Sequence, residues 1–163
     1  MYKLLLDIDA LIKISKAEFL DSVAENFNVA VTEEVYYETV IEGKKGFYQD
    51  ADNIDKLVQS GKIKIRIGRG YRKKKKPKQS FGIGEASVLQ AYQKGSLIVT
   101  DDLSFTAYME KEQIKSISSA HLLLALVKKK KVKKDKARYC LEKLRYLIRK
   151  EVYELIRKDI EGD

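Results

Sequence analysis

Four acidic residues stand at points in the chain where a parallel α/β sheet would gather them. Asp7 and Asp102 directly follow apolar, strand-like runs, whereas Glu38 and Glu85 lie on predicted helices. Carboxylates brought together in this way repel one another and are stabilised by cations, so the pattern predicts a metal site. The chain as a whole has a net charge of +9, and that combination points to phosphodiester chemistry.

The other metal-binding residue types are scarce. Cys140 is the only cysteine and His121 the only histidine, which excludes Cys/His zinc clusters and most histidine-centred triads. Cys140 lies on the apolar spacing of the last helix and is predicted to be a buried thiol, and His121 is predicted to be structural. A metal would therefore be held by oxygen, which favours Mg²⁺ or Mn²⁺ over Zn²⁺.

The positive charge is concentrated in two windows. Residues 69–78 and 128–136 together carry a net charge of +13, which leaves −4 for the rest of the chain. Localised charge of this kind suits a polyanion such as nucleic acid, although each run is equally consistent with a solvated surface connection. The first window supplies the candidate nucleic-acid-binding residues, which are Arg69, Arg72, Lys73, Lys74, Lys75 and Lys76.

Length and hydropathy indicate one folded domain over residues 1–163. Hydrophobic residues make up 44% of the chain, but no apolar run reaches the roughly 18 residues of a membrane span. The first residues lack the apolar core of a secretory signal, so a cytoplasmic protein is expected.

Apolar runs alternate with helical spacing along the chain. Strands are predicted near residues 2–7, 29–31, 63–67, 97–100 and 114–117, with Asp9 as the expected cap of the first helix. This alternation favours a three-layer α/β/α sandwich with a mostly parallel central sheet. A basic loop is predicted at 69–80, and one long amphipathic helix at about 134–158.

The order of the acidic residues resembles that of the PIN-domain (PilT N-terminus) nucleases, and the resemblance spans nearly the whole chain. Four short motifs carry it, in this order: Leu5-Leu6-Asp7-Ile8-Asp9-Ala10, Val31 through Glu38, Gly82-Ile83-Gly84-Glu85-Ala86, and Thr100-Asp101-Asp102. By this resemblance the metal-binding, catalytic carboxylates are Asp7, Glu38, Glu85 and Asp102, with Asp9 and Asp101 as additional candidates.

The chain departs from the family pattern at two positions. Glu85 and Ser104 stand where many members have Asp, so one metal is expected to bind more tightly than a second. Thr100 and Ser104 are candidates for orienting the ligands.

The resemblance also implies a function. A PIN-like protein would cleave RNA endonucleolytically with Mg²⁺ or Mn²⁺. Many small relatives are VapC-type toxins, which form homodimers and are inhibited by an antitoxin protein.

Two alternatives use the same residues differently. Asp7-Ile8-Asp9 resembles the nucleophile motif of haloacid-dehalogenase-type phosphatases, but Ala10-Leu11 stands where that family has Gly-Thr. A non-enzymatic RNA-binding module would use the basic runs alone, and its acids would be helix caps and surface residues.

Overall fold

The computed structural model describes residues 2–67 and 81–162 and is built around a parallel sheet. The strands are β1 (Lys3–Leu6), β2 (Asn28–Thr32), β3 (Ile63–Arg66), β4 (Ser96–Val99) and β5 (Ser116–Ile117). Their order across the sheet is β3-β2-β1-β4-β5, and every pair of neighbours is parallel. The predicted three-layer α/β/α architecture is confirmed. The candidate residues of the first basic window, Arg69, Arg72 and Lys73 to Lys76, lie outside the described residues.

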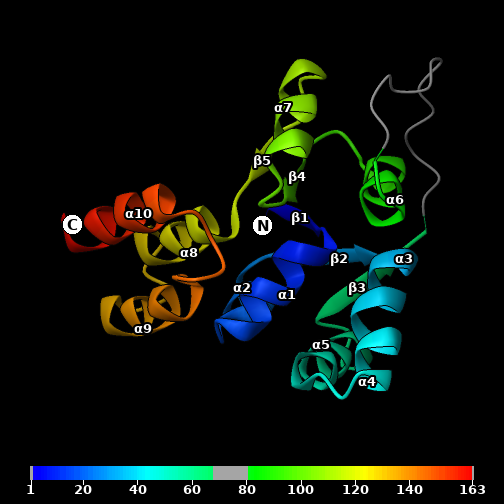
Figure 1. The fold of residues 1–163 in the computed structure, drawn as a ribbon, viewed down its shortest axis with the longest axis horizontal. Coiled ribbons are helices and arrows are strands. Elements are labelled where there is room, and N and C mark those ends of the chain that lie inside the picture. Colours follow the sequence, from blue (N-terminus) through cyan, green and yellow to red (C-terminus); the bar gives the residue numbers. More distant parts are fainter. Residues whose placement is uncertain (1, 68–80, 163) are drawn as a thin grey trace.

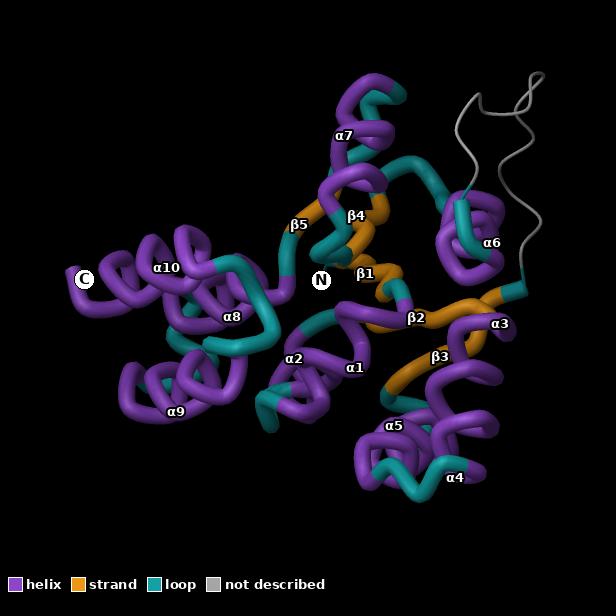
Figure 2. Tube along the Cα trace, in the orientation of Figure 1, coloured by secondary structure: helices purple, strands orange, loops and turns teal. Residues whose placement is uncertain are grey.

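Helices fill the connections between the strands (Figure 2). In chain order they are α1 (Ile8–Lys16), α2 (Leu20–Asn26), α3 (Glu33–Tyr36), a π-helical segment η1 (Tyr37–Glu42), α4 (Gly43–Lys45), α5 (Gln49–Gln59), α6 (Ile83–Ala91), α7 (Leu103–Lys111), α8 (Ser119–Lys128), α9 (Lys134–Leu144) and α10 (Lys150–Gly162). Figure 1 shows α6 and α7 on one side of the sheet and α1, α2 and α5 on the other. Crossovers of the usual right hand give this division, because the chain steps from β1 toward β3 and then back across the sheet to β4 and β5.

The core forms where the sheet is covered on both faces. Leu5 and Leu6 of the central strand β1 have no exposed surface, and neither do Ile98 and Val99 of β4. Continuous apolar runs are typical of parallel strands packed between two helical layers, and they made these strands predictable from the sequence. Cys140 is buried in α9, as predicted.

The predicted long helix at 134–158 is wrong. The chain instead forms α9 and α10, which are separated by residues 145–149 and pack on each other and on α8. One straight helix would leave half of its apolar face without a partner, whereas the fold-back buries Tyr153, Ile156 and Ile160. Residues 145–149 contain neither Gly nor Pro, and apolar residues continue at helical spacing through them, so the sequence has no local signal for the break.

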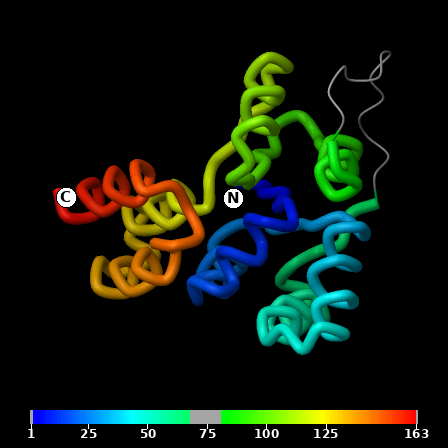
Figure 3. Tube along the Cα trace, in the orientation of Figure 1, coloured from blue at the N-terminus to red at the C-terminus, as the bar shows by residue number. Residues whose placement is uncertain are grey.

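The chain ends lie in different parts of the molecule. Figure 3 shows β1 near the centre and the carboxyl end of α10 at the outer end of the bundle that α8, α9 and α10 form. This bundle packs beside α1. No helix within residues 2–67 and 81–162 combines the length and the apolar character needed to cross a membrane.

Candidate active site

The strand order defines where a site can form. The connections leaving β1 run toward β3, and the chain then crosses back to β4, so the direction switches between β1 and β4. In open parallel sheets, ligands bind beyond the carboxyl ends of the strands at such a switch. Asp7 follows β1, and Thr100, Asp101 and Asp102 follow β4. The two motifs therefore meet at the place that the topology favours.

Asp7 is the buried carboxylate of this region. Its side chain is 3% exposed, and Oδ1 accepts a hydrogen bond from the Ala10 amide at 2.8 Å. Burial raises the pKa of Asp7 to about 7, although hydrogen bonds from Thr100 and Ala10 act against this rise. The negative charges of Asp9 and Asp101 raise it further. A carboxylate in this state is stabilised by a cation.

The expected capping role of Asp9 is wrong, because Asp7 caps α1. The helix begins at Ile8, directly after the strand, which leaves Asp7 as the residue in the capping position. Asp9 falls in the first turn of α1, is exposed, and pairs with Lys13 at 2.7 Å.

Thr100 connects the two strand ends. Its buried hydroxyl donates a hydrogen bond to Oδ2 of Asp7 and accepts one from the Asp102 amide at 3.2 Å. With Ala10 on Oδ1 and Thr100 on Oδ2, both oxygens of Asp7 are held in place. This geometry fits the predicted orienting role of Thr100. Ser104, the other candidate for that role, is exposed on α7.

Glu85 and Asp102 form a second acidic pair. The pKa of Glu85, which is partly buried, is raised by burial and, second, by the negative charge of Asp102. Asp102 is exposed and caps α7, and its Oδ1 accepts from the Phe105 amide at 2.7 Å. The two carboxylates are therefore close enough to repel each other, and a cation between them would relieve that repulsion.

Close packing at Gly84 sets the position of Glu85. A Cβ atom at residue 84 would collide with Cδ1 of Ile8, so any larger residue would force the Ile8 side chain to shift where α6 meets the start of α1. The Ser87 hydroxyl donates to the Gly84 carbonyl at 2.6 Å and lies 2.7 Å from the hydroxyl of Thr32, the cap of α3. These contacts fix the first turn of α6 against β2 and α1.

The two additional candidates are engaged with protein partners. Asp101 accepts hydrogen bonds from the amide and the hydroxyl of Ser119, at 2.9 and 2.6 Å. Its Oδ2 also lies 3.6 Å from Nζ of Lys13, the same lysine that pairs with Asp9. In this structure Asp101 links the end of β4 to α8, and Lys13 partly balances the charge of both acids.

Among the described residues, no interaction joins Glu38 to Asp7, Glu85 or Asp102. It lies on the π-helical segment η1 and is exposed. Within the described parts of the chain, no three acidic, histidine or cysteine side chains are close enough to hold one metal ion together. The structure thus groups Asp7 with Thr100 and Glu85 with Asp102, and the complete four-carboxylate set stays a prediction.

The chemistry of the donors fits a hard divalent cation. Asp7, Glu85 and Asp102 supply only carboxylate oxygens, which Mg²⁺ and Mn²⁺ prefer. The softer ligands are elsewhere, with Cys140 buried in α9 and His121 hydrogen-bonded to Ser118 on α8. The raised pKa values of Asp7 and Glu85 are also what uncompensated carboxylates would show before a cation joins them.

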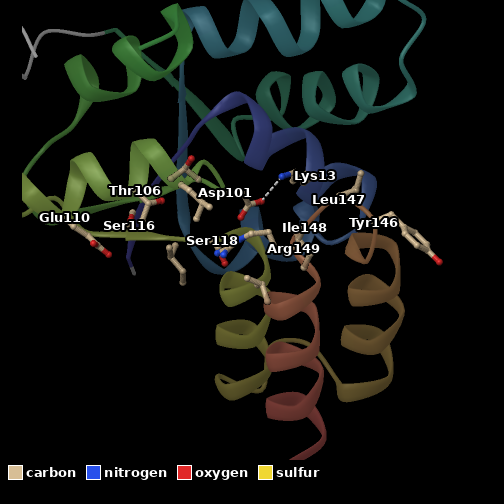
Figure 4. Close-up of a pocket in the computed structure, with 14 residues that line it drawn as sticks. Lys13, Asp101, Thr106, Glu110, Ser116, Ser118, Tyr146, Leu147, Ile148 and Arg149 are labelled. Carbon is tan, nitrogen blue, oxygen red and sulfur yellow. Dashed lines mark ion pairs between the residues drawn. The ribbon is translucent and has the colours of Figure 1, made fainter. Parts of the chain in front are cut away.

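A cavity of about 500 Å³ lies beside Thr100 (Figure 4). It separates α7 from the turn between α9 and α10, and its lining includes Lys13, Asp101 and Arg149. In Figure 4 these three side chains approach from α1, from the end of β4 and from the turn before α10. Sequence reasoning missed Lys13 and Arg149, because neither belongs to a motif and only the fold brings them together.

Comparison with known families decides the relationship. A family model described as a PIN domain matches residues 4–161. The chain belongs to the PIN-domain family. Searches among curated proteins and among solved structures gave no match. PIN domains are generally nucleases, act on nucleic acid and use divalent metal ions, so membership favours a nuclease over the phosphatase alternative.

Thr100 offers a direct test of this PIN site. Replacing Thr100 with Val keeps the shape of the side chain but removes the hydroxyl that donates to Asp7. We expect cleavage to slow by roughly 10- to 100-fold, the usual effect of losing a hydrogen-bond partner of a metal ligand. Because that hydrogen bond lowers the pKa of Asp7, the pH profile of cleavage should also move to higher pH.

The matched control is Thr106→Val, which removes a hydroxyl that donates to the Asp102 backbone carbonyl at 2.8 Å. Rates measured from pH 5 to 9 in Mn²⁺ should be close to those of the unmodified protein. Equal profiles for the two variants would mean that Thr100 does not position Asp7.

Proposed function

We propose that this PIN-domain protein is a divalent-metal-dependent endoribonuclease whose catalytic residues are Asp7, Glu38, Glu85 and Asp102. The observation that carries the proposal is Asp7, a buried carboxylate with a raised pKa at the switch point of the sheet, next to the Thr100–Asp102 turn. Burying a carboxylate is costly, and the cap of α1 could be an uncharged Asn or Ser, so binding of a cation would account for the charge at this position.

The protein residues have separable roles in this mechanism. Asp7, Glu85 and Asp102 would hold Mg²⁺ or Mn²⁺, with Glu38 completing the set. When bound, the cation would supply a water of lowered pKa for attack on phosphorus and would stabilise the departing oxygen. Thr100 links the end of β4 to Asp7 at the end of β1. The capping hydrogen bond to α7 holds Asp102 in place. No side-chain nucleophile is required, which agrees with the positions of Cys140 and His121.

The region around the carboxylates suits a phosphodiester chain. Lys13 and Arg149 are cations on the wall of the cavity beside Thr100. The basic window at 69–78 lies between β3 and α6 in the sequence, and α6 carries Glu85. These cations would hold the phosphate backbone near the site, and their effect would weaken as salt rises.

RNA as the substrate and the biological role rest on the family resemblance. By that resemblance we propose a VapC-type toxin that forms a homodimer, is inhibited by an antitoxin protein and works in the cytoplasm, where it would meet RNA.

Removal of metal tests the proposed reaction. Protein treated with EDTA and then dialysed should leave a labelled single-stranded RNA intact. Addition of Mg²⁺ or Mn²⁺ should restore internal cleavage of the RNA and leave DNA of the same sequence uncut. Products are resolved on a denaturing gel, and Ca²⁺ serves as a control for charge screening alone. Undiminished cleavage in EDTA would defeat the metal requirement, and RNA binding without cleavage in any cation would favour the non-enzymatic RNA-binding module.

A further inference from the structure

A second hollow lies on the sheet itself, away from the cavity beside Thr100. It has a volume of about 410 Å³ and is lined by residues of β1, β2 and β3, of the turns at their amino ends and of the last turn of α2. Four of its lining residues are cationic, and we call this set the basic groove: Lys3, Lys62, Lys64 and Arg66. Among its described lining residues, Glu25 is the one carboxylate, and it lies 3.6 Å from Nζ of Lys62.

Strand register places three of these cations on one face of the sheet. Lys3 is paired with Asn28, whereas Lys64 and Arg66 are paired with Ala30 and Thr32. Residues paired in register between parallel strands point to the same face, and so do alternate residues of one strand. Lys3, Lys64 and Arg66 therefore share a face.

That face belongs to the α6 side of the sheet. Thr32 lies on it and bonds to Ser87 of α6, so α6 covers the carboxyl end of β2. The amino-terminal part of the same face is open at Lys3, Asn28 and Lys64, which are exposed, whereas Ala30 between them is buried. Parallel sheets are usually covered on both faces by apolar helices, so an open and cationic area needs an explanation.

Stability does not provide that explanation. Neighbouring like charges on one face of a sheet repel each other. In the part of the chain that the structure describes, Lys3, Lys64 and Arg66 form no ion pair. Charge on an edge strand prevents unwanted strand pairing, which would account for Lys64 and Arg66 on β3. It does not account for Lys3, because β1 is the middle strand.

We propose that the basic groove binds the phosphate backbone of the nucleic-acid substrate at a distance from the carboxylates. The proposal rests on the proposed function for the identity of the substrate as RNA. Lys62, Lys64 and Arg66 occur at every second residue, so they are about 7 Å apart along the chain and lead toward the carboxyl end of β3. Lys3 is on β1, two strands away from β3, so it lies roughly 10 Å from the cations of β3 across the sheet. A single phosphate cannot reach all of these cations, whereas successive phosphates of one strand can.

The position of the groove sets a length requirement. Strands of four residues separate the amino ends from the carboxyl ends by about 13 Å. Arg66 lies at the carboxyl end of β3, but an RNA that reaches Lys3 and Lys62 from the carboxylate site must cover at least that distance. A dinucleotide, the short RNA of this test, has one phosphodiester group, which cannot contact the groove while it is held at the carboxylates, so its cleavage should be insensitive to the groove.

The test uses the double variant Lys64→Ala/Arg66→Ala in the full chain. RNA binding is measured by fluorescence anisotropy with a 20-nucleotide single strand over a range of KCl concentrations, in an Asp7→Asn background so that no cleavage occurs. For single strands, each lost phosphate contact lowers the slope of log K against log salt by about 0.7, so a decrease of about 1.4 is expected. Affinity at low salt should fall roughly tenfold or more.

The matched control is Lys111→Ala/Lys158→Ala, which removes the same charge from exposed positions of α7 and α10 that do not line the groove. It should keep the parent slope to within about half a unit, which is less than one contact. Thermal unfolding midpoints at or above the parent value would show that both double variants are folded. A groove variant with the same slope and affinity as the control would overturn the proposal.

Cleavage separates this inference from the proposed function. With Asp7 intact, the groove variant should cut the long RNA more slowly at subsaturating protein and cut the short RNA at the parent rate. If the parent protein cuts no RNA but the groove variant still loses affinity and slope, the nuclease proposal fails and the groove stands. If the parent cuts normally and the variant binds normally, the groove alone is wrong.

Discussion

Changing Asp7 to Asn should abolish metal-dependent RNA cleavage while leaving RNA affinity nearly unchanged. The amide keeps the size of the side chain and an oxygen that can accept from Ala10, so the cap of α1 is retained. What disappears is the negative charge of a side chain that is only 3% exposed at the strand switch. We expect the rate to fall by more than about 100-fold, beyond the effect of losing an outer partner of a metal ligand.

The measurement is single-turnover cleavage in saturating Mn²⁺, accompanied by anisotropy binding in EDTA. Affinity should change less than about twofold, because the cations that contact phosphate are untouched. Asp135→Asn is the control, since Asp135 is exposed at the start of α9. Cleavage that survives Asp7→Asn would refute the assignment of Asp7 and the proposed centre with it.

The strands could be predicted because of how a parallel sheet is built. Both faces of β1 and β4 are buried, so their residues form short continuous apolar runs that helical spacing does not produce. The starts of some helices also have local signals in the sequence, such as Thr32 before α3 and Gly82 before α6. All five predicted strands occur, and their ends differ from the predicted ones by at most two residues.

Tertiary packing decided the features that the sequence did not predict. The break between α9 and α10 has no local signal, and it arises because Tyr153 and Ile156 are buried only when the chain folds back. The capping role of Asp7 depends on α1 beginning directly after β1, whereas spacing alone favoured Asp9. In both cases the prediction used the spacing of residues within one segment, whereas the packing of a neighbouring element determines where the helix begins or ends.

The candidate site shows the same division. The order of the acidic motifs placed Asp7 and Asp102 at the ends of β1 and β4, and the topology agrees. Distances between side chains are not encoded in motif order, so neither the Thr100 bridge nor the exposed position of Glu38 could be read from it. The basic groove is harder still, because Lys3 and Lys64 meet only through the register of two strand pairs.

The free energy of unfolding should reveal Asp7 independently of activity. Its pKa is about 7 in the folded protein, against an ordinary value of 3.8. Below pH 4 it is protonated in both states and has no net effect. Between pH 4 and 7 the folded state binds a proton that the unfolded state has released, so stability falls as pH rises through this window. Above pH 7 the loss is complete, at up to about 4 kcal/mol.

Asn at position 7 does not titrate, so this loss should be absent from the Asp7→Asn variant. In EDTA the variant should be more stable than the parent at pH 8, with a difference that shrinks toward zero as pH is lowered to 4. Urea unfolding followed by circular dichroism at pH 4, 5, 6, 7 and 8 measures this directly. Parallel pH profiles for the two proteins would show that burial does not perturb Asp7 as described.

Metal should offset much of this loss of stability in the parent protein. A cation that binds only the folded state stabilises it by RT ln(1 + [L]/Kd), or about 2.7 kcal/mol at one hundred times Kd. Because a bound cation favours the ionised carboxylate, Mn²⁺ at pH 8 should raise the stability of the parent protein and flatten its pH profile. The Asp7→Asn variant should gain much less, and Asp135→Asn should gain as much as the parent. An equal gain for all three proteins would place the bound ion away from Asp7.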